Sequence, residues 1–260
     1  MQRRHVLAPA LLAGALALAG CSGEDAPAEE TTPATAAEQL AVAQANLEAT
    51  DALTITLTST NVPTDVNGVR SATGVGVIDE ASNRFAGEVE ARITGITATV
   101  EIICIGEDAY MKLFTPEFAP TDLEALGAPN PTSFLDPDTG IASLMAATTD
   151  LAEGGRQREG REILREITGT LPGEKIEGLL RLGGPGLEFD VTYGLTPEDE
   201  LRRAVLEGEF YEGTRSTYTL VLTDYGQAVP IEVPIEVPTP GSGGTETGTD
   251  APTPTASATS

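Results

Sequence analysis

Few side chains in this sequence could act as nucleophiles or metal ligands, and one of them occupies an unusual place. Cys21 follows an apolar run at residues 6–19 and precedes an acidic segment, in the stretch LALAGCSGED. Arg3 and Arg4 precede the run. A positive start and a short apolar run are typical of a secretory signal, and the run is too short to span a bilayer. The thiol of Cys21 therefore lies where a signal ends, which points to chemistry on the cysteine itself.

The residues before Cys21 resemble the lipobox of bacterial lipoproteins, with the order Leu18, Ala19, Gly20, Cys21. In that family the thiol is diacylated and the signal is removed before the cysteine. The resemblance implies that residues 1–20 are a lipoprotein signal peptide and that Cys21 is the site of lipidation. An ordinary secretory signal is the alternative, but it leaves Cys21 unexplained. The export route, Sec or Tat, stays open.

Histidine chemistry is missing from the expected mature chain, because the one histidine, His5, lies inside the signal peptide. This excludes histidine-based acid–base catalysis and histidine metal ligands. We find no nucleophile motif, glycine-rich phosphate loop or metal-ligand spacing in the sequence. The 40 acidic residues leave carboxylate-pair chemistry formally open, but they fall in turns and on outward faces. We therefore expect no enzyme activity, no cofactor and no metal site.

The charge balance is strongly acidic. The full chain has 40 acidic and 15 basic residues and a formal net charge of −25. Removal of residues 1–20 takes away two arginines and lowers this charge to −27. Such a chain is repelled by nucleic-acid phosphates and by anionic membrane surfaces. We expect no nucleic-acid partner, and attachment to the cytoplasmic membrane through acylated Cys21, at about 0.8 kcal/mol per buried methylene.

Composition divides the mature chain into three parts. Residues 21–35 are rich in Ala, Pro, Thr and Glu, and residues 238–260 in Gly, Ser, Thr and Pro, so we expect both to be flexible. The first would be a tether carrying the acylated cysteine. The second would be a solubilising tail, with O-linked sugars as an open alternative. Residues 36–237 suffice for one domain with its own apolar core.

Alternating apolar residues predict a series of strands in this domain. In residues 84–93, Phe85, Val89 and Ala91 share one face and Glu88 lies on the other. Short turns favour an antiparallel meander, and glycines within strands favour strong curvature. Helices are expected at residues 38–50, at residues 173–182 and after Asp136. The other expected strands cover residues 53–60, 70–79, 96–106, 108–114, 160–172, 187–195, 201–211 and 216–226.

Residues 115–135 contain four prolines and no clear periodicity, and a loop of that length usually has a task. Asp136 and Pro137 then suit the N-cap and first residue of a helix. A calcium loop starting at Asp136 is the alternative, but Ala147 stands where an EF-hand needs its closing glutamate. Capping is therefore preferred. The sum is an α+β domain with eight or nine strands and three helices.

Four stretches, together with the order of the elements, point to a known family. They are GEVEARITGITATVEIICIGEDAYMKL, DPDTGIASLM, ITGTLP and LTDYGQAVPIEVP. Over about residues 35–237 the chain resembles the LppX/LprAFG family of actinobacterial, mycobacterial-type lipoproteins. The resemblance implies a curved antiparallel half-barrel sheet with helices packed on its concave side around an apolar cavity. It also implies that the cavity holds the acyl chains of lipids or lipoglycans.

The resemblance places Val89 in the cavity wall near the entrance, and strand alternation extends this wall. Packing in a filled core is the alternative for every such residue, because alternation does not distinguish a core from a lined cavity. Cys104 is expected to be a small buried hydrophobe. On the sheet side we expect Val89, Ala91, Ile93, Ala98, Val100 and Ile102, on the helical side Ile141, Leu144 and Met145, and as a lid Phe118, Leu123 and Phe134.

The sequence thus predicts a lipoprotein anchored on the extracytoplasmic face of the cell membrane. It would bind a lipid or glycolipid and carry it toward the outer envelope, with an envelope transporter as a compatible partner. The alternative is a non-catalytic surface adaptor or sensor module that binds another envelope protein. An adaptor would show a filled core and an exposed apolar patch in place of a cavity.

Overall fold

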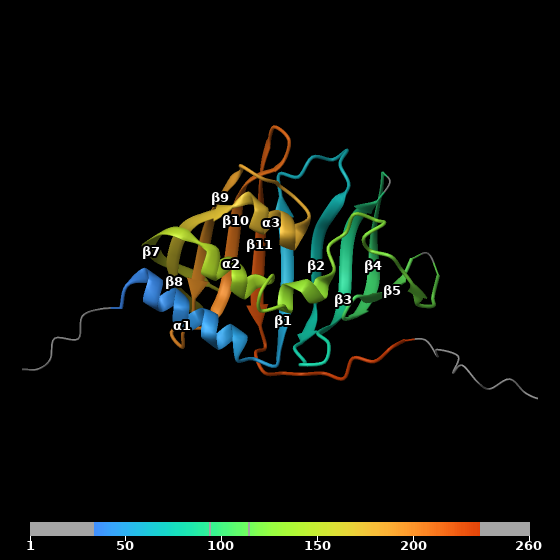
Figure 1. The fold of residues 1–260 in the computed structure, drawn as a ribbon, viewed down its shortest axis with the longest axis horizontal. Helices are drawn as coiled ribbons and strands as arrows, with labels where there is room; N and C mark the ends of the chain where they lie inside the picture. Colours follow the sequence, from blue (N-terminus) through green and yellow to red (C-terminus); the bar gives the residue numbers. More distant parts are fainter. Residues whose placement is uncertain (1–33, 94, 114, 235–260) are drawn as a thin grey trace, which may run out of the picture. The chain divides into compact units, whose positions relative to one another are not determined.

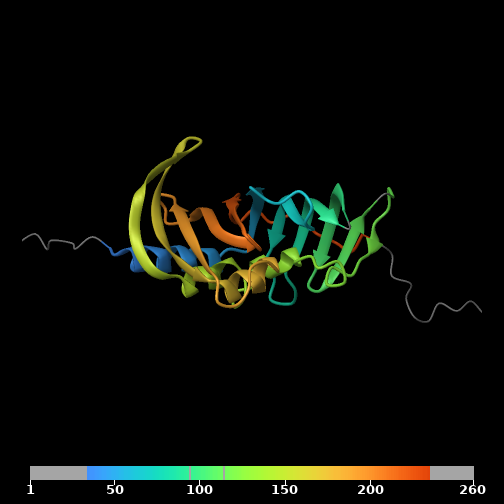
Figure 2. The same cartoon turned by 90° about the horizontal axis from the view of Figure 1, so that it is seen from above.

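A computed structural model describes residues 34–93, 95–113 and 115–234. They form one open antiparallel sheet with helices on one of its faces (Figures 1 and 2). The expected signal peptide, the lipidation site Cys21, nearly all of the tether and the tail at residues 238–260 lie outside the described residues. Within the described part, no helix has the length and apolar character that crossing a bilayer requires.

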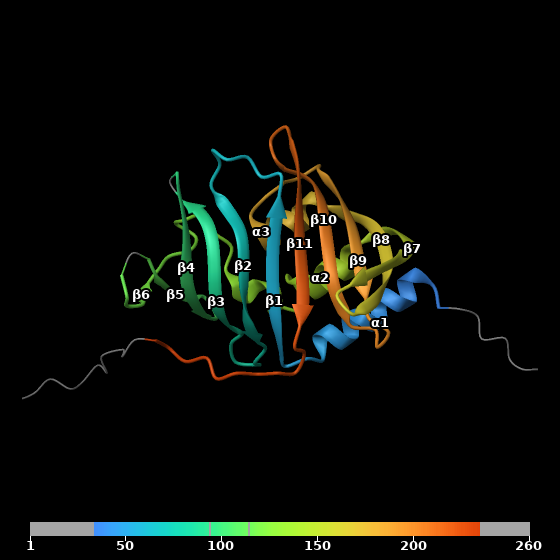
Figure 3. The ribbon, with the colours of Figure 1, turned by 180° about the vertical axis from the view of Figure 1, so that it is seen from behind.

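The sheet consists of two meanders that meet at its centre. Neighbours follow the order β6-β5-β4-β3-β2-β1-β11-β10-β9-β8-β7, so only the contact between β1 and β11 joins strands distant in sequence. In that contact Leu57 lies opposite Leu220 (Figure 3). The strands are β1 (Ala52–Thr60), β2 (Gly68–Val77), β3 (Arg84–Ile93), β4 (Ile96–Ile105), β5 (Asp108–Lys112), β6 (Ala119–Pro120), β7 (Thr149–Glu159), β8 (Glu162–Pro172), β9 (Glu188–Leu195), β10 (Leu201–Tyr211) and β11 (Thr214–Thr223).

The α-helices cover the sheet unevenly. The helices α1 (Ala36–Glu48), α2 (Ile141–Ala147) and α3 (Gly173–Leu180) make their main sheet contacts with β7, β8 and β10. Over β2, β3 and β4 lies the short 3-10 helix η1 (Pro131–Leu135). The inner face of the first meander is therefore covered by a loop with one 3-10 turn, and the second meander by α-helices (Figure 1).

This arrangement divides the apolar interior into two clusters. The larger cluster joins the three α-helices to the inner faces of β1 and β8–β11, with Leu144, Ile176 and Leu220 among its members. The smaller cluster lies on β3, β4 and β5 and includes Phe85, Val100 and Leu123 from the loop. A sheet with two separate clusters leaves a region between them that side chains do not have to fill.

The first helix shows how local sequence sets an element boundary. Thr35 and Glu38 form a capping box: the Glu38 amide donates to Thr35 Oγ1 at 3.3 Å, and the Thr35 amide donates to Glu38 Oε2 at 2.8 Å. The bond from the Thr35 amide, together with a second one from the Thr35 hydroxyl to Glu38 Oε2 at 2.9 Å, lowers the pKa of Glu38. The helix consequently starts at Ala36, two residues before the expected start. It buries Leu40, Ala43 and Leu47, the face that the sequence predicts.

All nine predicted strands are present, but the count of eight or nine is wrong because β6 and β7 were not predicted. β7 is exposed along nearly its whole length, and only Leu151 and Glu159 are half-buried. Alternation reports burial of one face, so a strand with two exposed faces gives no such signal. Backbone pairing with β8 holds β7 at the sheet edge.

The predicted start of the second helix is also wrong. α2 begins at Ile141, with Gly140 at the N-cap position. Asp136 instead closes the preceding turn, because its Oδ1 accepts hydrogen bonds from the amides of Asp138 at 2.9 Å and Thr139 at 2.8 Å. Asp and Pro suit turns as well as helix starts, so the pattern itself was ambiguous.

Two facing glycines allow β2 and β3 to approach closely with an aromatic ring packed over them. Gly74 lies opposite Gly87. A Cβ on Gly74 would stand 2.4 Å from the ring of Phe85, and a Cβ on Gly87 would stand 2.2 Å from the carbonyl oxygen of Thr73. Real Cβ atoms do not approach backbone this closely, so any side chain at Gly87 must displace a strand.

We predict that Gly87→Ala lowers the free energy of unfolding by about 1–3 kcal/mol, because it overpacks the sheet. Gly178→Ala is the matched control, since a Cβ there meets nothing within 4 Å. It should raise the free energy of unfolding by about 0.5–1 kcal/mol, because alanine suits a helix interior better than glycine. Urea unfolding of both variants measures this. Equal stability of Gly87→Ala and the parent would contradict the close approach of the strands.

Candidate functional site

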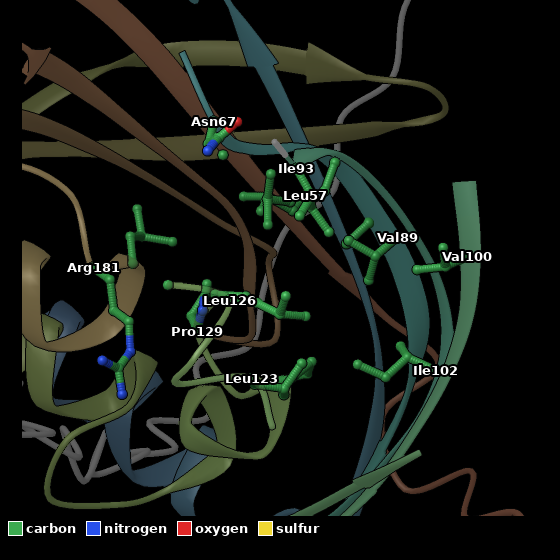
Figure 4. A pocket seen from close by; sticks show the side chains of 18 of the residues that line it. Leu57, Asn67, Val89, Ile93, Val100, Ile102, Leu123, Leu126, Pro129 and Arg181 are labelled. Atoms are coloured by element: carbon green, nitrogen blue, oxygen red, sulfur yellow. The ribbon is translucent and has the colours of Figure 1, made fainter. Parts of the chain in front are cut away.

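A cavity of about 320 Å³ opens between the two apolar clusters (Figure 4). The larger cluster contributes Ile55 and Leu57 from β1, Phe134 from η1 and Leu180 from α3. From the smaller cluster come Phe85, Val89, Ala91, Val100, Ile102, Met111 and Leu123. The cavity is thus lined by residues of both apolar clusters and lies between them.

The sheet wall follows from the pairing of β3 with β4. Val89 lies opposite Val100, and Gly87 lies opposite Ile102. Because side chains alternate across a strand, all four positions face the same side of the sheet. Gly87 has no side chain and Val89 has a short one, so these two positions fill little of the space beside the sheet. Figure 4 shows these strands curving around the labelled cavity residues.

The opposite wall is the loop before η1, which carries Leu123, Leu126 and Pro129 toward the sheet (Figure 4). Two hydrogen bonds fix this loop to the β4–β5 turn. Asn130 Nδ2 donates to the Gly106 carbonyl at 2.8 Å, and Thr132 Oγ1 donates to the same oxygen at 2.9 Å. At its other end the Thr121 amide donates to the Ala109 carbonyl at 2.8 Å. The loop is therefore fixed at both ends, and its apolar side chains cover the cavity.

The cavity offers little chemistry to a reaction. The described residues that form its wall include no Asp, Glu, His, Cys or Lys. The Tyr218 hydroxyl is occupied, because it donates to the Val69 carbonyl at 3.2 Å and accepts from Tyr211 at 2.8 Å. Burial raises the pKa of Tyr218. Across residues 34–234, as far as they are described, no group of three or more His, Cys, Asp or Glu is placed to hold a metal.

Comparison with known proteins identifies the fold. A family model described as LppX_LprAFG lipoprotein matches residues 34–231. The chain belongs to the LppX/LprAFG lipoprotein family. No curated protein matches the sequence. The match covers every described strand and helix of the domain, so the order of elements that suggested this family in the sequence is confirmed.

Two solved structures of the LppX/LprAFG family are similar in fold. LprF from Mycobacterium bovis has a TM-score of 0.65 at 15% identity, with 77% of this chain and 97% of LprF covered. LppX from Mycobacterium tuberculosis has a TM-score of 0.55 at 14% identity, with 76% of this chain and 98% of LppX covered. At such identities the likeness concerns the fold, and the site must be argued from this chain.

Seven of the residues named from the sequence lie in the cavity wall. The expected sheet wall differs at Ala98, which packs against the smaller cluster without lining the cavity. Of the lid residues, Phe118 lies elsewhere: its ring is 4.5 Å from Lys112 Nζ, and Lys112 pairs with Glu101 on the outward face. The seven in the wall are Val89, Ala91, Ile93, Val100, Ile102, Leu123 and Phe134.

The expected helical wall is not where the sequence placed it. Ile141, Leu144 and Met145 are each 2% exposed and belong to the larger cluster, away from the cavity lining. The physical reason is that α2 packs on α1, α3 and β8, over the second meander. The cavity lies over the first meander, where the loop provides the cover instead.

Sequence reasoning missed the wall that comes from the centre of the sheet. Alternation in residues 53–60 put Ile55 and Leu57 on one face, but nothing in the pattern shows that this face borders a cavity. Tyr218 and Leu182 were also missed. Their contribution depends on the pairing of β1 with β11 and on the end of α3, which are long-range features.

Cys104 belongs to the smaller cluster and is 0% exposed. Burial raises the pKa of its thiol to about 12. The thiolate is the reactive form of cysteine, so at pH 8 almost none is present. Cys104 therefore acts as a small hydrophobe behind the cavity wall, as a structural cysteine does.

We predict that Cys104 resists thiol reagents in the folded family member. In a full chain carrying Cys21→Ala, Cys104 is the one remaining thiol, so labelling reports on it alone. At pH 8 the labelling rate should rise about a hundredfold or more when urea unfolds the chain, because exposure and pKa both return to ordinary values. Labelling at the rate of a free thiol in native buffer would contradict the burial of this residue.

Proposed function

We propose that this chain is a non-catalytic lipoprotein that binds acyl chains of a lipid or glycolipid in the cavity and carries them toward the outer envelope. The observation that carries the proposal is the cavity between two separate apolar clusters. Membership of the LppX/LprAFG lipoprotein family supports it. The wall is apolar apart from a few residues, and apolar walls bind acyl chains without directed chemistry.

The energetics of such a carrier require no catalysis. Each methylene that leaves the bilayer loses about 0.8 kcal/mol of burial and regains a similar amount in an apolar cavity. The cavity also gains, because its wall atoms lack partners on one side until a chain enters. Extraction and release are then nearly isoenergetic, which is what a reversible carrier needs.

The size of the cavity favours one amphiphile with its polar part outside. A volume of about 320 Å³ lies at the lower end of the range for ligand sites. A large lipoglycan would therefore keep most of its bulk beyond the mouth. For longer acyl chains, the wall best suited to move away from the sheet is the loop that carries Leu123 and Leu126, because no α-helix lies over the first meander.

The anchoring part of the proposal rests on the sequence. Cys21 would carry two acyl chains on the extracytoplasmic face of the cytoplasmic membrane, and residues 21–35 would be the tether. An acidic domain does not adhere to anionic lipids by charge, so acylation is the feature that keeps it close to its substrate. An envelope transporter that accepts or supplies the lipid is part of the same proposal.

The adaptor alternative has less support. It requires a filled core and a contiguous exposed apolar patch. Among the described residues, the large apolar side chains that are exposed belong to α1, β4, β8 and the segment after β11, so they do not share one element. They are Val42, Ile96, Ile163, Val229 and Val233.

We predict that Val89→Trp abolishes lipid loading. The indole would occupy the cavity volume beside Val100, so an acyl chain could no longer enter, while the open space spares the domain from severe overpacking. Glu90→Trp is the matched control, because this exposed neighbour faces the other side of the same strand. Both variants, and the parent, would carry Cys21→Ala and be purified from an actinobacterial host.

Native mass spectrometry of the three proteins is the measurement. Near-stoichiometric lipid on the parent and on Glu90→Trp, with none on Val89→Trp, is the expected result. Thermal unfolding shows whether Val89→Trp stays folded. A lipid-free parent that takes up no added host lipid would reject the carrier and leave the adaptor. Unchanged loading of a folded Val89→Trp would remove the cavity as the binding site.

A further inference from the structure

The charges in the cavity wall have one sign. Acidic residues outnumber basic ones 40 to 15 in the chain, yet none of the described residues that line the cavity carries a carboxylate. Its two charged residues are Arg92, from the sheet side, and Arg181, from the helix side. Acyl chains need no charge, so a purely apolar ligand leaves both arginines without a role in binding.

Arg92 has an unmet need for a hydrogen-bond acceptor. It lies at the end of β3 opposite Gly68, and its Nε is buried without a partner. Its other guanidinium nitrogens make no hydrogen bond or ion pair with the described residues either. Of the other arginines with a buried Nε, Arg202 uses that atom in an ion pair with Glu162 Oε2 at 2.9 Å. The remaining three use their other nitrogens in hydrogen bonds: Arg84, Arg165 and Arg203.

Arg181 stands where another residue type would cost less. It is the C-cap of α3 and has φ +54°, the left-handed conformation that favours glycine. Any residue other than glycine is disfavoured in this conformation, because its Cβ atom stands too close to the following carbonyl oxygen. The side chain is exposed and borders the cavity near Leu126 and Pro129 (Figure 4). It forms no ion pair with the described residues.

We propose that Arg92 and Arg181 bind an anionic head group, a phosphate above all, on the lipid whose acyl chains fill the cavity. This rests on the proposed lipid-binding function and narrows its ligand to anionic amphiphiles. The half-buried guanidinium of Arg92 beside an apolar wall is costly unless an acceptor compensates it, and the exposed Arg181 adds a second cation to the same wall. The planar guanidinium matches a phosphate with two parallel hydrogen bonds, which a neutral head group does not provide.

The acidity of the whole chain agrees with such a site. At physiological salt, charges beyond about 8 Å are largely screened, so the two arginines act on a group seated at the cavity while distant carboxylates do not. The net negative charge of the chain opposes general attraction to an anionic membrane surface. Selection of the head group therefore takes place at the cavity itself.

The test compares two lipids with the same acyl chains. Phosphatidic acid carries a phosphate and diacylglycerol carries none. Binding of each to the full chain with Cys21→Ala is measured by native mass spectrometry and by displacement of a fluorescent fatty acid, at low and high salt. The variants are Arg92→Gln, Arg181→Gln and both together. Arg161→Gln is the charge-matched control, because this exposed arginine lies at the β7–β8 turn outside the cavity wall.

The parent and Arg161→Gln should bind phosphatidic acid about tenfold or more tightly than diacylglycerol, as charge-assisted hydrogen bonds predict. High salt should reduce this preference. The double variant should lose it and keep its affinity for diacylglycerol, while each single variant should lose part of it. Retained diacylglycerol binding also shows that the double variant is folded.

Other outcomes overturn the proposal in distinguishable ways. Equal affinity of the parent for both lipids rejects the head-group site and leaves the carrier function intact. A preference that survives in the double variant rejects the two arginines as its source. No binding of either lipid rejects the carrier function itself. Inorganic phosphate that binds the parent as tightly as phosphatidic acid does would identify a site for free phosphate, and would reject the lipid head group as the source of the anion.

Discussion

The structure depends on one constraint: eleven strands form a continuous sheet, but the three α-helices are long enough to cover only part of its inner face. Backbone hydrogen bonds hold the strands together from one edge of the sheet to the other and do not require a helix over each strand. Burial of the inner face is satisfied by helices over the second meander and by a loop over the first. The two apolar clusters and the cavity between them follow from this mismatch.

The same mismatch separates stability from binding. The larger cluster contains the three helices and the fully buried Tyr193, whose hydroxyl is paired with Thr148 at 2.8 Å, so this half resembles an ordinary packed core. The smaller cluster lies under a loop held at the Gly106 carbonyl. A wall formed by a loop can move to enlarge the cavity without disturbing the packing of the larger cluster. This is a physical basis for the proposed carrier function, in which loading would change one side of the domain.

Much of the fold was predictable because alternation reports burial directly. The nine expected strands are present, and the buried face of β3, with Val89 and Ala91, is the expected one. The predictions failed where alternation is missing or where a residue type suits more than one structure. β7 is exposed on both faces and gives no alternation, and Asp136 fits a turn as well as a helix start. Arg181 in a left-handed helix cap gives no sequence signal, since glycine is the residue expected there.

The sequence by itself determined the acidic balance, the presence of a single histidine at position 5, the alternating strands and the order of elements that identifies the family. Only the tertiary structure decided which apolar residues line the cavity. Val89 and Leu144 are both apolar and both buried, at 9% and 2% exposure, but one borders the cavity and the other lies in the packed core. The difference arises because α2 rests on the second meander, and periodicity within a segment carries no information about which partner covers it.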